Sequence, residues 1–549
     1  MENQRIILWA TLLFLLWMMY QAWQDDYAPK PSTPTVGEQP AQAGDALPDL
    51  PEPGEAPAIK PTPEGMPALE TESSVRDGGT VTVSTDVLEV EISTVGASLI
   101  RVSLPEYPIK KNEPDKPVVL LNDEPATRFL MHSGLRGRGD SEPNHRASFS
   151  TRATEYRLAE GDDELKVVFD WVDGGGLAAQ KVFTFTRGSY AIELEQTLIN
   201  RSGEDWRGAP YMQIQRRNVP QERSMFDVDT FSFTGPVIYD GEKYDKLDVD
   251  DLADEPVNQT VTGGWIAAIQ HYFLVAAVPP GEQSFNYQAR LAAGDYLISE
   301  IGPVEVVPAG ETRTFTQTLW LGPKLQADLE KIAPGLELTV DYGVLTVLAK
   351  PLFWLLQKVY QFLGNWGWSI IVVTFLIKLV FYKLTETQGR SMAKMRKLQP
   401  RLKNLQERYK DDKQALSKAM MDLYKREKVN PAAGCLPILI QIPVFLSFYW
   451  VLLESAELRQ APFMLWITDI SSRDPFFILP VLMGAAMFGQ FKLNPTPTTD
   501  PVQAKVFMIM PLIMTGMMAF FPAGLVLYWL TNTLLSIAQQ WHINKKLGA

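Results

Sequence analysis

Residues 366–382 read WGWSIIVVTFLIKLVFY, an apolar stretch that holds one charged residue, Lys378. An α-helix rises about 1.5 Å per residue, so this stretch would extend roughly 25 Å and nearly cross the hydrocarbon core of a bilayer. A charge near the middle of a bilayer costs about 2.5 to 3.5 kcal/mol, so Lys378 should face protein or water. The stretch therefore predicts a membrane helix that presents a cation to a wet cavity.

Lys378 also has a simpler interpretation, in which its long stem reaches the nearer headgroup layer, close to Lys383. Thr374 lies one turn earlier on the same helix face and adds a polar neighbour. Because ionisable groups inside a membrane are by default functional candidates, this neighbour favours the cavity.

The charge of the chain is divided between two parts of opposite sign. Residues 24–343 hold 27 Lys and Arg against 52 Asp and Glu, a balance of −25, and the remaining residues carry +12, which gives the net charge of −13. One cysteine, Cys435, excludes an intrachain disulfide. It leaves the compartment open, because a large exported domain can be stable without disulfide bridges.

The N-terminal part predicts a membrane anchor followed by a tether. Residues 6–23 are apolar and no small-residue cleavage site follows them, so residues 1–24 are predicted to be an uncleaved signal-anchor helix. Residues 25–74 hold eleven prolines between Pro29 and Pro67. Such a segment buries too little apolar surface to offset its ordering entropy, so it predicts an extended, disordered linker.

Residues 75–343 predict a large all-β sandwich domain. Short runs alternate apolar and polar residues, as in antiparallel strands with one buried face. These runs read TVTVSTDVLEVEIS, ASLIRVSL, ELKVVFDWV, KVFTFTRG, AIELEQTLIN and TFTQTLWLG. The histidines of the domain lack metal-ligand spacing, and isolated acids such as Glu193 and Glu195 are interpreted as strand-face charges. An interaction or folding-support role is therefore expected.

Residues 344–363 are apolar but carry two lysines and one glutamine. A helix that begins at Pro351 would place Gln357 and Lys358 away from its Leu, Trp and Phe face. This pattern predicts an interfacial helix that leads from the β-domain into the membrane.

Residues 384–430 predict a cytoplasmic helical hairpin with a basic exterior. Residues 383–428 hold 14 Lys and Arg against 6 Asp and Glu, and apolar residues recur there at spacings of 3 and 4. A solvated coiled coil and a docking surface for ribosomal RNA or anionic headgroups explain these charges equally well. In the second case the contacts would come from Lys394, Arg396, Lys397, Arg401, Lys403 and Arg408.

Four further apolar spans follow, at residues 435–453, 476–491, 506–521 and 525–543. With the anchor and the Lys378 helix they make six transmembrane helices, of which five form a membrane core within residues 344–543. The positive-inside rule then puts both termini, including the short basic tail 544–549, in the cytoplasm and the β-domain outside. The fold class expected is a polytopic α-helical membrane protein with a large external β-domain.

Polar residues on several helices predict a hydrophilic groove. On the last helix they recur at spacings of 4, 4 and 3, which puts them on one face. They should converge with Lys378 because the lipid-facing side should be apolar, although ordinary hydrogen bonds between helices are the alternative. The predicted groove residues are Thr374, Lys378, Gln441, Tyr528, Asn532 and Ser536.

Methionines of the preceding helix predict a flexible apolar surface that could accept varied apolar segments of a substrate. They are Met508, Met510, Met514, Met517 and Met518. The alternative is that they face lipid without any further role.

Within residues 344–543 lie six long segments: GNWGWSIIVVTF, SMAKMRKLQPRL, KVNPAAGCLPILIQIPVFLSFYWVL, SAELRQAPFMLWI, DPFFILPVLMG and FPAGLVLYWLTN. In sequence and in order they closely resemble the membrane core of the YidC family of bacterial membrane protein insertases. The resemblance implies an inner-membrane insertase that acts alone or beside the Sec translocon, with a β-supersandwich outside the membrane, as in bacteria with two membranes.

The resemblance also implies roles for single residues. Thr374 matches the groove threonine of the family, and Tyr528 and Trp529 match its aromatic pair on the last helix, which adds Trp529 to the predicted groove residues. Lys378 stands where the family usually carries an arginine, so the charge is kept but the planar five-donor fork is lost. Since the tail is short, ribosome contact would depend on the hairpin and the neighbouring loops.

These observations predict a membrane protein insertase and chaperone that is not an enzyme and needs no cofactor. No P-loop sequence is found, and burial of apolar surface at about 25 cal/mol per Å² can drive insertion. The expected partners are nascent membrane-protein chains, small integral membrane proteins inserted independently of Sec, the ribosome, Sec translocon components and the phospholipid bilayer.

Two other functions remain open from the sequence. A solute transporter or channel with a midplane lysine would require inverted repeats and broken helices, which the sequence does not show. A carbohydrate-active β-domain would require a cluster of His and carboxylate residues, which the sequence does not show either.

Overall fold

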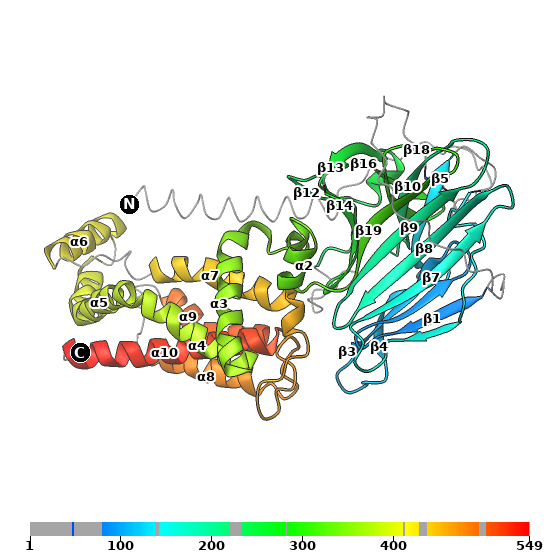
Figure 1. The fold of residues 1–549 in the computed structure, drawn as a ribbon. Coiled ribbons are helices and arrows are strands. Elements are labelled where there is room, and N and C mark those ends of the chain that lie inside the picture. The colour runs from blue at the N-terminus through cyan, green and yellow to red at the C-terminus, as the bar shows by residue number, and fades with distance from the viewer. Residues whose placement is uncertain are drawn as a thin grey trace. The chain divides into compact units, whose positions relative to one another are not determined.

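The computed structural model describes residues 47–48, 79–137, 142–219, 232–281, 283–409, 412–427, 436–493 and 501–547. The predicted anchor, residues 1–24, and nearly all of the predicted linker, residues 25–74, lie outside the described residues. The described chain comprises a β part, residues 80–323, and a helical part that follows it (Figure 1).

Two β-sheets pack face to face in the β part, with eleven and eight described strands (Figure 1). The larger sheet has the order β13 (Val257–Thr262), β16 (Ser284–Ala292), β17 (Asp295–Ile301), β10 (Trp206–Arg217), β5 (Phe129–Gly137), β3 (Ser98–Pro108), β2 (Glu89–Ser93), β1 (Thr80–Ser84) and β6 (Glu155–Arg157), with β18 (Glu305–Val307) beside β10 and β4 (Pro117–Leu121) beside β3. The smaller sheet has the order β12 (Tyr244–Lys246), β11 (Gly235–Tyr239), β14 (Trp265–Ile269), β15 (Phe273–Val278), β19 (Thr312–Pro323), β9 (Ala191–Asn200), β8 (Leu177–Thr186) and β7 (Glu164–Val172). One buried apolar cluster contains residues of both sheets, so the pair forms a sandwich.

The alternating runs of the sequence form strands with one buried face, as predicted. On β9, Ile192 and Leu194 are buried, while Glu193 and Glu195 between and beyond them are exposed. Glu195 lies opposite Thr316 of β19 on the outer face of the sheet. The interpretation of these acids as strand-face charges is therefore confirmed.

Two polar side chains cross the core of the sandwich from one sheet to the other. Lys181 of β8 donates hydrogen bonds to the carbonyl oxygens of Gly96 and Ser133, at 2.6 and 2.7 Å. Glu300 of β17 accepts one from Gln317 of β19 at 3.2 Å. Both side chains are fully buried, and burial lowers the pKa of Lys181 and raises the pKa of Glu300 to about 8. The sequence pattern predicted neither bridge.

Helices make up most of the chain after residue 323. They are α2 (Gln326–Ile332), α3 (Thr346–Leu363), α4 (Trp366–Val380), α5 (Tyr382–Arg408), α6 (Lys413–Arg426), α7 (Leu436–Glu454), α8 (Ile478–Leu493), α9 (Pro501–Met518) and α10 (Ala523–Leu547), with short 3₁₀ turns η3 (Leu336–Thr339), η4 (Gly343–Leu345) and η6 (Ala456–Leu458). None of the described helices has both the length and the apolar character that crossing a membrane requires.

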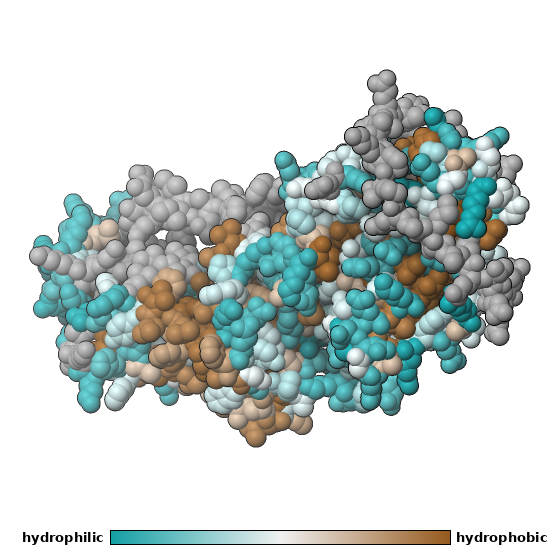
Figure 2. Space-filling model, viewed as in Figure 1, coloured by the Kyte–Doolittle hydropathy of each residue, from teal (hydrophilic) through white to brown (hydrophobic). Residues whose placement is uncertain are grey.

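Apolar side chains are exposed on several of these helices. Figure 2 shows hydrophobic residues gathered on the helical part, around α4 and α9, whereas the β part is mostly hydrophilic. The exposed residues include Phe375, Leu379, Val481, Leu482, Met508, Ile509, Leu512 and Ile513.

The prediction that a helix begins at Pro351 is wrong. Helix α3 begins five residues earlier, at Thr346, and contains Pro351 within it. A proline lacks the N–H that would bond to the carbonyl four residues before, here that of Val347. The side chain of Val347 is 83% exposed, so this first turn lies at the surface, where water can satisfy the free carbonyl.

Helices α5 and α6 form the hairpin that the sequence predicts for residues 384–430. Leu398 and Leu402 of α5 are buried against Leu423 and other apolar residues of α6. The side chain of Asp412 caps α6 by accepting hydrogen bonds from the amides of residues 414 and 415, and Arg401 pairs with Glu427 at 2.7 Å.

Candidate functional site

The Lys378 ammonium points from α4 to α10. Its Nζ donates a hydrogen bond to Ser536 Oγ at 2.7 Å, and the Ser536 hydroxyl donates in turn to the carbonyl oxygen of Asn532 at 2.7 Å. Among the described residues, no carboxylate is close enough to affect the charge of this amine. Lys378 is therefore a half-buried cation, held by a neutral hydroxyl of α10 within the helical part.

Three other predicted groove residues differ in burial and in their hydrogen bonds. Thr374 is buried, and its hydroxyl donates to the carbonyl oxygen of Ile370 in its own helix at 2.6 Å. Asn532 is 8% exposed and lies one turn before Ser536 on α10. Gln441 is half-buried on α7. Only Ser536 of the predicted set bonds directly to Lys378 in the described chain.

The aromatic pair on α10 packs against α7. The ring of Tyr528 is buried and stacks on Phe448 with the centroids 4.6 Å apart. Trp529 meets Phe445 edge to face at 4.7 Å. Tyr528 precedes Ser536 by eight residues, or about 12 Å along the helix, and Asn532 lies midway between them. The sequence analysis missed Phe445 and Phe448, because no local pattern pairs residues so far apart in the chain.

The five methionines of α9 do not form one surface. Met508, Met510 and Met517 are 57%, 39% and 44% exposed, and Met514 is partly buried. Met518 is only 1% exposed and lies in the core of the helical part. Met518 therefore does not belong to the exposed apolar face, which consists of the other methionines and their neighbours.

The hairpin exposes basic side chains on α5. Lys394, Lys397, Arg401 and Arg408 are all exposed, and Arg401 is the one that pairs with Glu427. The side chains of Arg396 and Lys403, which the sequence analysis also singled out, lie outside the described part of the chain.

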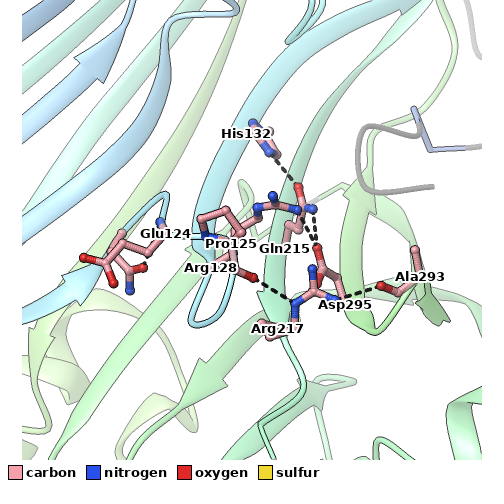
Figure 3. Close-up of polar contacts among 9 residues, drawn as sticks. Glu124, Pro125, Arg128, His132, Gln215, Arg217, Ala293 and Asp295 are labelled. Atoms are coloured by element: carbon pink, nitrogen blue, oxygen red, sulfur yellow. Dashed lines mark hydrogen bonds and ion pairs between the residues drawn. The ribbon is translucent and has the colours of Figure 1, made fainter. Parts of the chain in front are cut away.

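A separate polar cluster lies at one end of the larger sheet (Figure 3). His132 of β5 is hydrogen-bonded to Gln215 of β10, and Gln215 donates to Asp295 of β17 at 2.6 Å. Asp295 also pairs with Arg128 at 3.2 Å and with Arg217 at 2.9 Å. The structure thus brings a histidine and a carboxylate close together, which the sequence did not show.

This cluster is built to hold a turn and not to transfer protons. Arg217 donates to the carbonyl oxygen of Ala293 at 2.8 Å, in the turn between β16 and β17 (Figure 3). Asp295 is 1% exposed, and its carboxylate lies between the guanidinium groups of Arg128 and Arg217, where it accepts a hydrogen bond from Gln215, so its place in the cluster is that of a buried ion-pair partner. No group of side chains within the described residues could hold a metal ion.

Two family models match this chain, and between them they cover nearly all of it after residue 79. The model described as YidC periplasmic domain matches residues 80–355, and the model described as 60Kd inner membrane protein matches residues 358–549. The Membrane protein insertase YidC of Thioalkalivibrio sulfidiphilus is 46% identical over 563 residues, which cover 100% of this chain and 99% of the relative. The chain belongs to the YidC family of membrane protein insertases.

A second YidC protein is similar to the same extent, and solved structures match at lower identity. That of Methylococcus capsulatus is 46% identical over 552 residues, with 100% of this chain and 99% of the relative covered. The crystal structure of an active YidC insertase with its first transmembrane domain resolved matches at 18% identity and a TM-score of 0.38, and covers 85% of this chain. A galactose mutarotase related enzyme from Lactobacillus acidophilus matches 44% of this chain at 11% identity and a TM-score of 0.31.

The family assignment fixes the broad placement of the protein. It is an inner-membrane protein with a periplasmic domain, and the family consists of insertases and not of enzymes. The resemblance noted in the membrane core is thereby confirmed, and it extends over the β part as well.

Proposed function

We propose that this YidC-family protein inserts nascent membrane proteins through a groove at Lys378 that is open to the cytoplasm and to lipid. The observation that carries the proposal is the Lys378 amine, the one charge of the largely apolar helix α4, which no described carboxylate neutralises and which the Ser536 hydroxyl holds. An acidic residue about 4 Å from such a cation is attracted by about 4 kcal/mol at an effective dielectric constant of 20. That attraction would draw the short acidic tail of a substrate into the groove.

The exposed apolar face of α9 would then guide the hydrophobic segment of the substrate into lipid. Met508, Met510 and Met517 offer flexible side chains that adapt to different apolar sequences. Helix α8 has 16 residues, or about 24 Å, which is shorter than a hydrocarbon core of about 30 Å and favours local thinning of the bilayer. Burial of the segment at about 25 cal/mol per Å² supplies the driving force.

The proposed topology has six transmembrane helices, with both termini in the cytoplasm. Contacts between the β part and the α7–α8 connection support it, because both should then lie on the periplasmic side. Arg459 donates to the carbonyl oxygen of Pro108 at 2.8 Å, and His271 is hydrogen-bonded to the carbonyl oxygen of Leu453 at 2.8 Å. Glu457 of the same connection is half-buried and accepts a hydrogen bond from the amide of Gln326 at 3.2 Å, and desolvation raises its pKa to about 7.

Liposomes that contain this protein alone test the proposal. A single-span precursor with an acidic external tail is expected to become protease-protected at least about threefold above protein-free liposomes, without any nucleotide, because burial of its apolar segment drives insertion. A photocrosslinker at Met517 should capture the precursor, whereas one at the adjacent, buried Met518 should not. Protection equal to that of protein-free liposomes would contradict insertion, and flux of small ions without protection would favour a channel.

The ribosome and anionic headgroups are the proposed partners of the hairpin, and Sec translocon components are proposed as further partners of the protein. We expect the triple replacement of Lys394, Arg401 and Arg408 by Gln to weaken co-sedimentation with ribosomes about three- to tenfold at low salt, because fewer phosphate contacts release fewer counterions. The slope of binding against salt concentration should decrease as well. A solvated coiled coil without a docking role would bind equally well before and after the change.

A further inference from the structure

The base of the hairpin is fastened to α10 at the point where α4 gives way to α5. Gln539 of α10 donates hydrogen bonds to Thr385 Oγ1 at 2.7 Å and to the carbonyl oxygen of Tyr382 at 3.3 Å. Thr385 Oγ1 lies 3.0 Å from the carbonyl oxygen of Phe381. Phe381 is the one residue between the end of α4 at Val380 and the start of α5 at Tyr382, so Gln539 bonds to the first turn of α5 directly after this break.

One turn further along, α5 packs closely against α10. A Cβ atom on Gly389 would come within 2.7 Å of Ile543 Cδ1 and 3.0 Å of Gln540 Oε1. A side chain at position 389 would therefore displace the ends of the Ile543 and Gln540 side chains, so the two helices pack closely at this glycine. The first two turns of α5 are thus held on α10 by a polar contact and a steric contact, and α5 also touches α7.

The face of α10 that holds the hairpin continues the face that holds the groove cation. Ser536, the partner of Lys378, precedes Gln539 by three residues, or roughly one helical turn. The two bridges, Lys378 to Ser536 and Gln539 to Thr385, lie on the two sides of the break at Phe381. One helix therefore positions both the cation of the groove and the root of the hairpin.

We propose that Gln539 and Thr385 form a clamp that sets the angle at which the hairpin leaves the membrane. Both are positioning residues. The existence of the clamp does not depend on the proposed function, whereas its role, the alignment of a docked ribosome with the groove, rests on that function. Helix α5 has 27 residues and is about 40 Å long, so a swing of about 10° at Phe381 would move its far end by about 7 Å. Without the clamp, the break at Phe381 would let a ribosome docked on the hairpin lose its alignment with the groove.

Spin labels on the full-length protein in lipid nanodiscs test the clamp. Lys418 of α6 and Lys492 of α8 are exposed and can be replaced by labelled cysteines in a Cys435→Ser background. We expect the distance distribution between the labels to broaden about twofold in Thr385→Val, because the hydroxyl that accepts from Gln539 is lost. Gln539→Leu should broaden it to the same extent, and Thr385→Ser should keep the narrow distribution.

Thr387→Val is the matched control. Thr387 lies on the same helix and its hydroxyl donates to the carbonyl oxygen of Lys383 at 2.9 Å, but no residue of α10 is a described partner of it. Equal broadening in Thr387→Val, or none in Thr385→Val and Gln539→Leu, would overturn the clamp.

Insertion assays separate the clamp from the groove. Insertion of ribosome-bound chains should fall roughly three- to fivefold in Thr385→Val, because this variant loses one hydrogen bond. Crosslinking of a released precursor to Met517 should stay unchanged. A variant that is merely destabilised would lose both the insertion of ribosome-bound chains and the crosslinking of the released precursor, and that result would count against a positioning role. A protein that shows the expected distances but inserts nothing in any form would contradict the proposed function and leave the clamp standing.

Discussion

Lys378→Glu is expected to lower the insertion of chains with acidic external tails by at least about tenfold. Attraction of about 4 kcal/mol at 4 Å becomes repulsion of similar size, and about 1.4 kcal/mol corresponds to a factor of ten. Lys378→Ala should have a smaller effect, because it removes attraction without adding repulsion. Lys378→Arg should retain activity, because a single charge and not a planar fork is what the Ser536 hydroxyl accommodates here. Protease protection in liposomes measures all three.

Charge reversal at Lys383 is the control for Lys378. Lys383 lies five residues further on, beyond the break at Phe381, and its side chain is exposed. Lys383→Glu changes the net charge by the same amount, so a general electrostatic effect on the membrane surface would appear in both variants. If Lys378→Glu inserted acidic-tailed chains as well as the unmodified protein does, the charge mechanism would be wrong. Chains with neutral tails should be affected little by either change.

Periodicity in the sequence was sufficient to predict the strands and helices whose two faces differ in polarity. Strand β9 could be predicted because apolar and acidic residues alternate in it, and α5 because Leu398 and Leu402 recur at helical spacing. Lys378 could be identified as a candidate because a single charge in an apolar helix is unusual in itself. In each case the decisive information lies within one short segment.

Contacts between distant segments could not be predicted in this way. Met517 and Met518 are adjacent and identical in type, yet one is 44% exposed and the other 1%, because α9 is apolar all round and only its neighbours decide which face is covered. The polar face of the last helix predicted that Ser536 would converge with Lys378, but it could not single out Ser536 from Tyr528 and Asn532 as the residue that bonds to the amine. The sequence analysis missed that α3 begins before Pro351, because it took the proline as the first residue of the helix. A proline inside a helix leaves one carbonyl without its N–H partner, and the sequence does not show where the surroundings tolerate this.

Glu300→Gln is expected to stabilise the β part at pH 8 and to change little at pH 4. Burial raises the pKa of Glu300 from 4.5 to about 8 in the folded protein. Between these two values the folded state holds a proton that the unfolded state has lost, so the stability falls as the pH rises through this window. The full cost, reached above pH 8, is on the order of 5 kcal/mol. Glutamine resembles the protonated carboxyl and does not titrate, so it still accepts from Gln317 without this cost.

The test follows unfolding of the β part in the full-length protein by protease cleavage within residues 80–323 on heating. The midpoint of Glu300→Gln should exceed that of the unmodified protein at pH 8, and the difference should shrink steadily toward pH 4.5. Glu305→Gln is the matched control, because Glu305 pairs with Arg313 at 2.6 Å and the same substitution there removes an ion pair. It should not stabilise at any pH. A difference for Glu300→Gln that is the same at pH 4.5 and pH 8 would show that this carboxyl does not stay protonated in the core, and the bridge to Gln317 would then have to be a charged one.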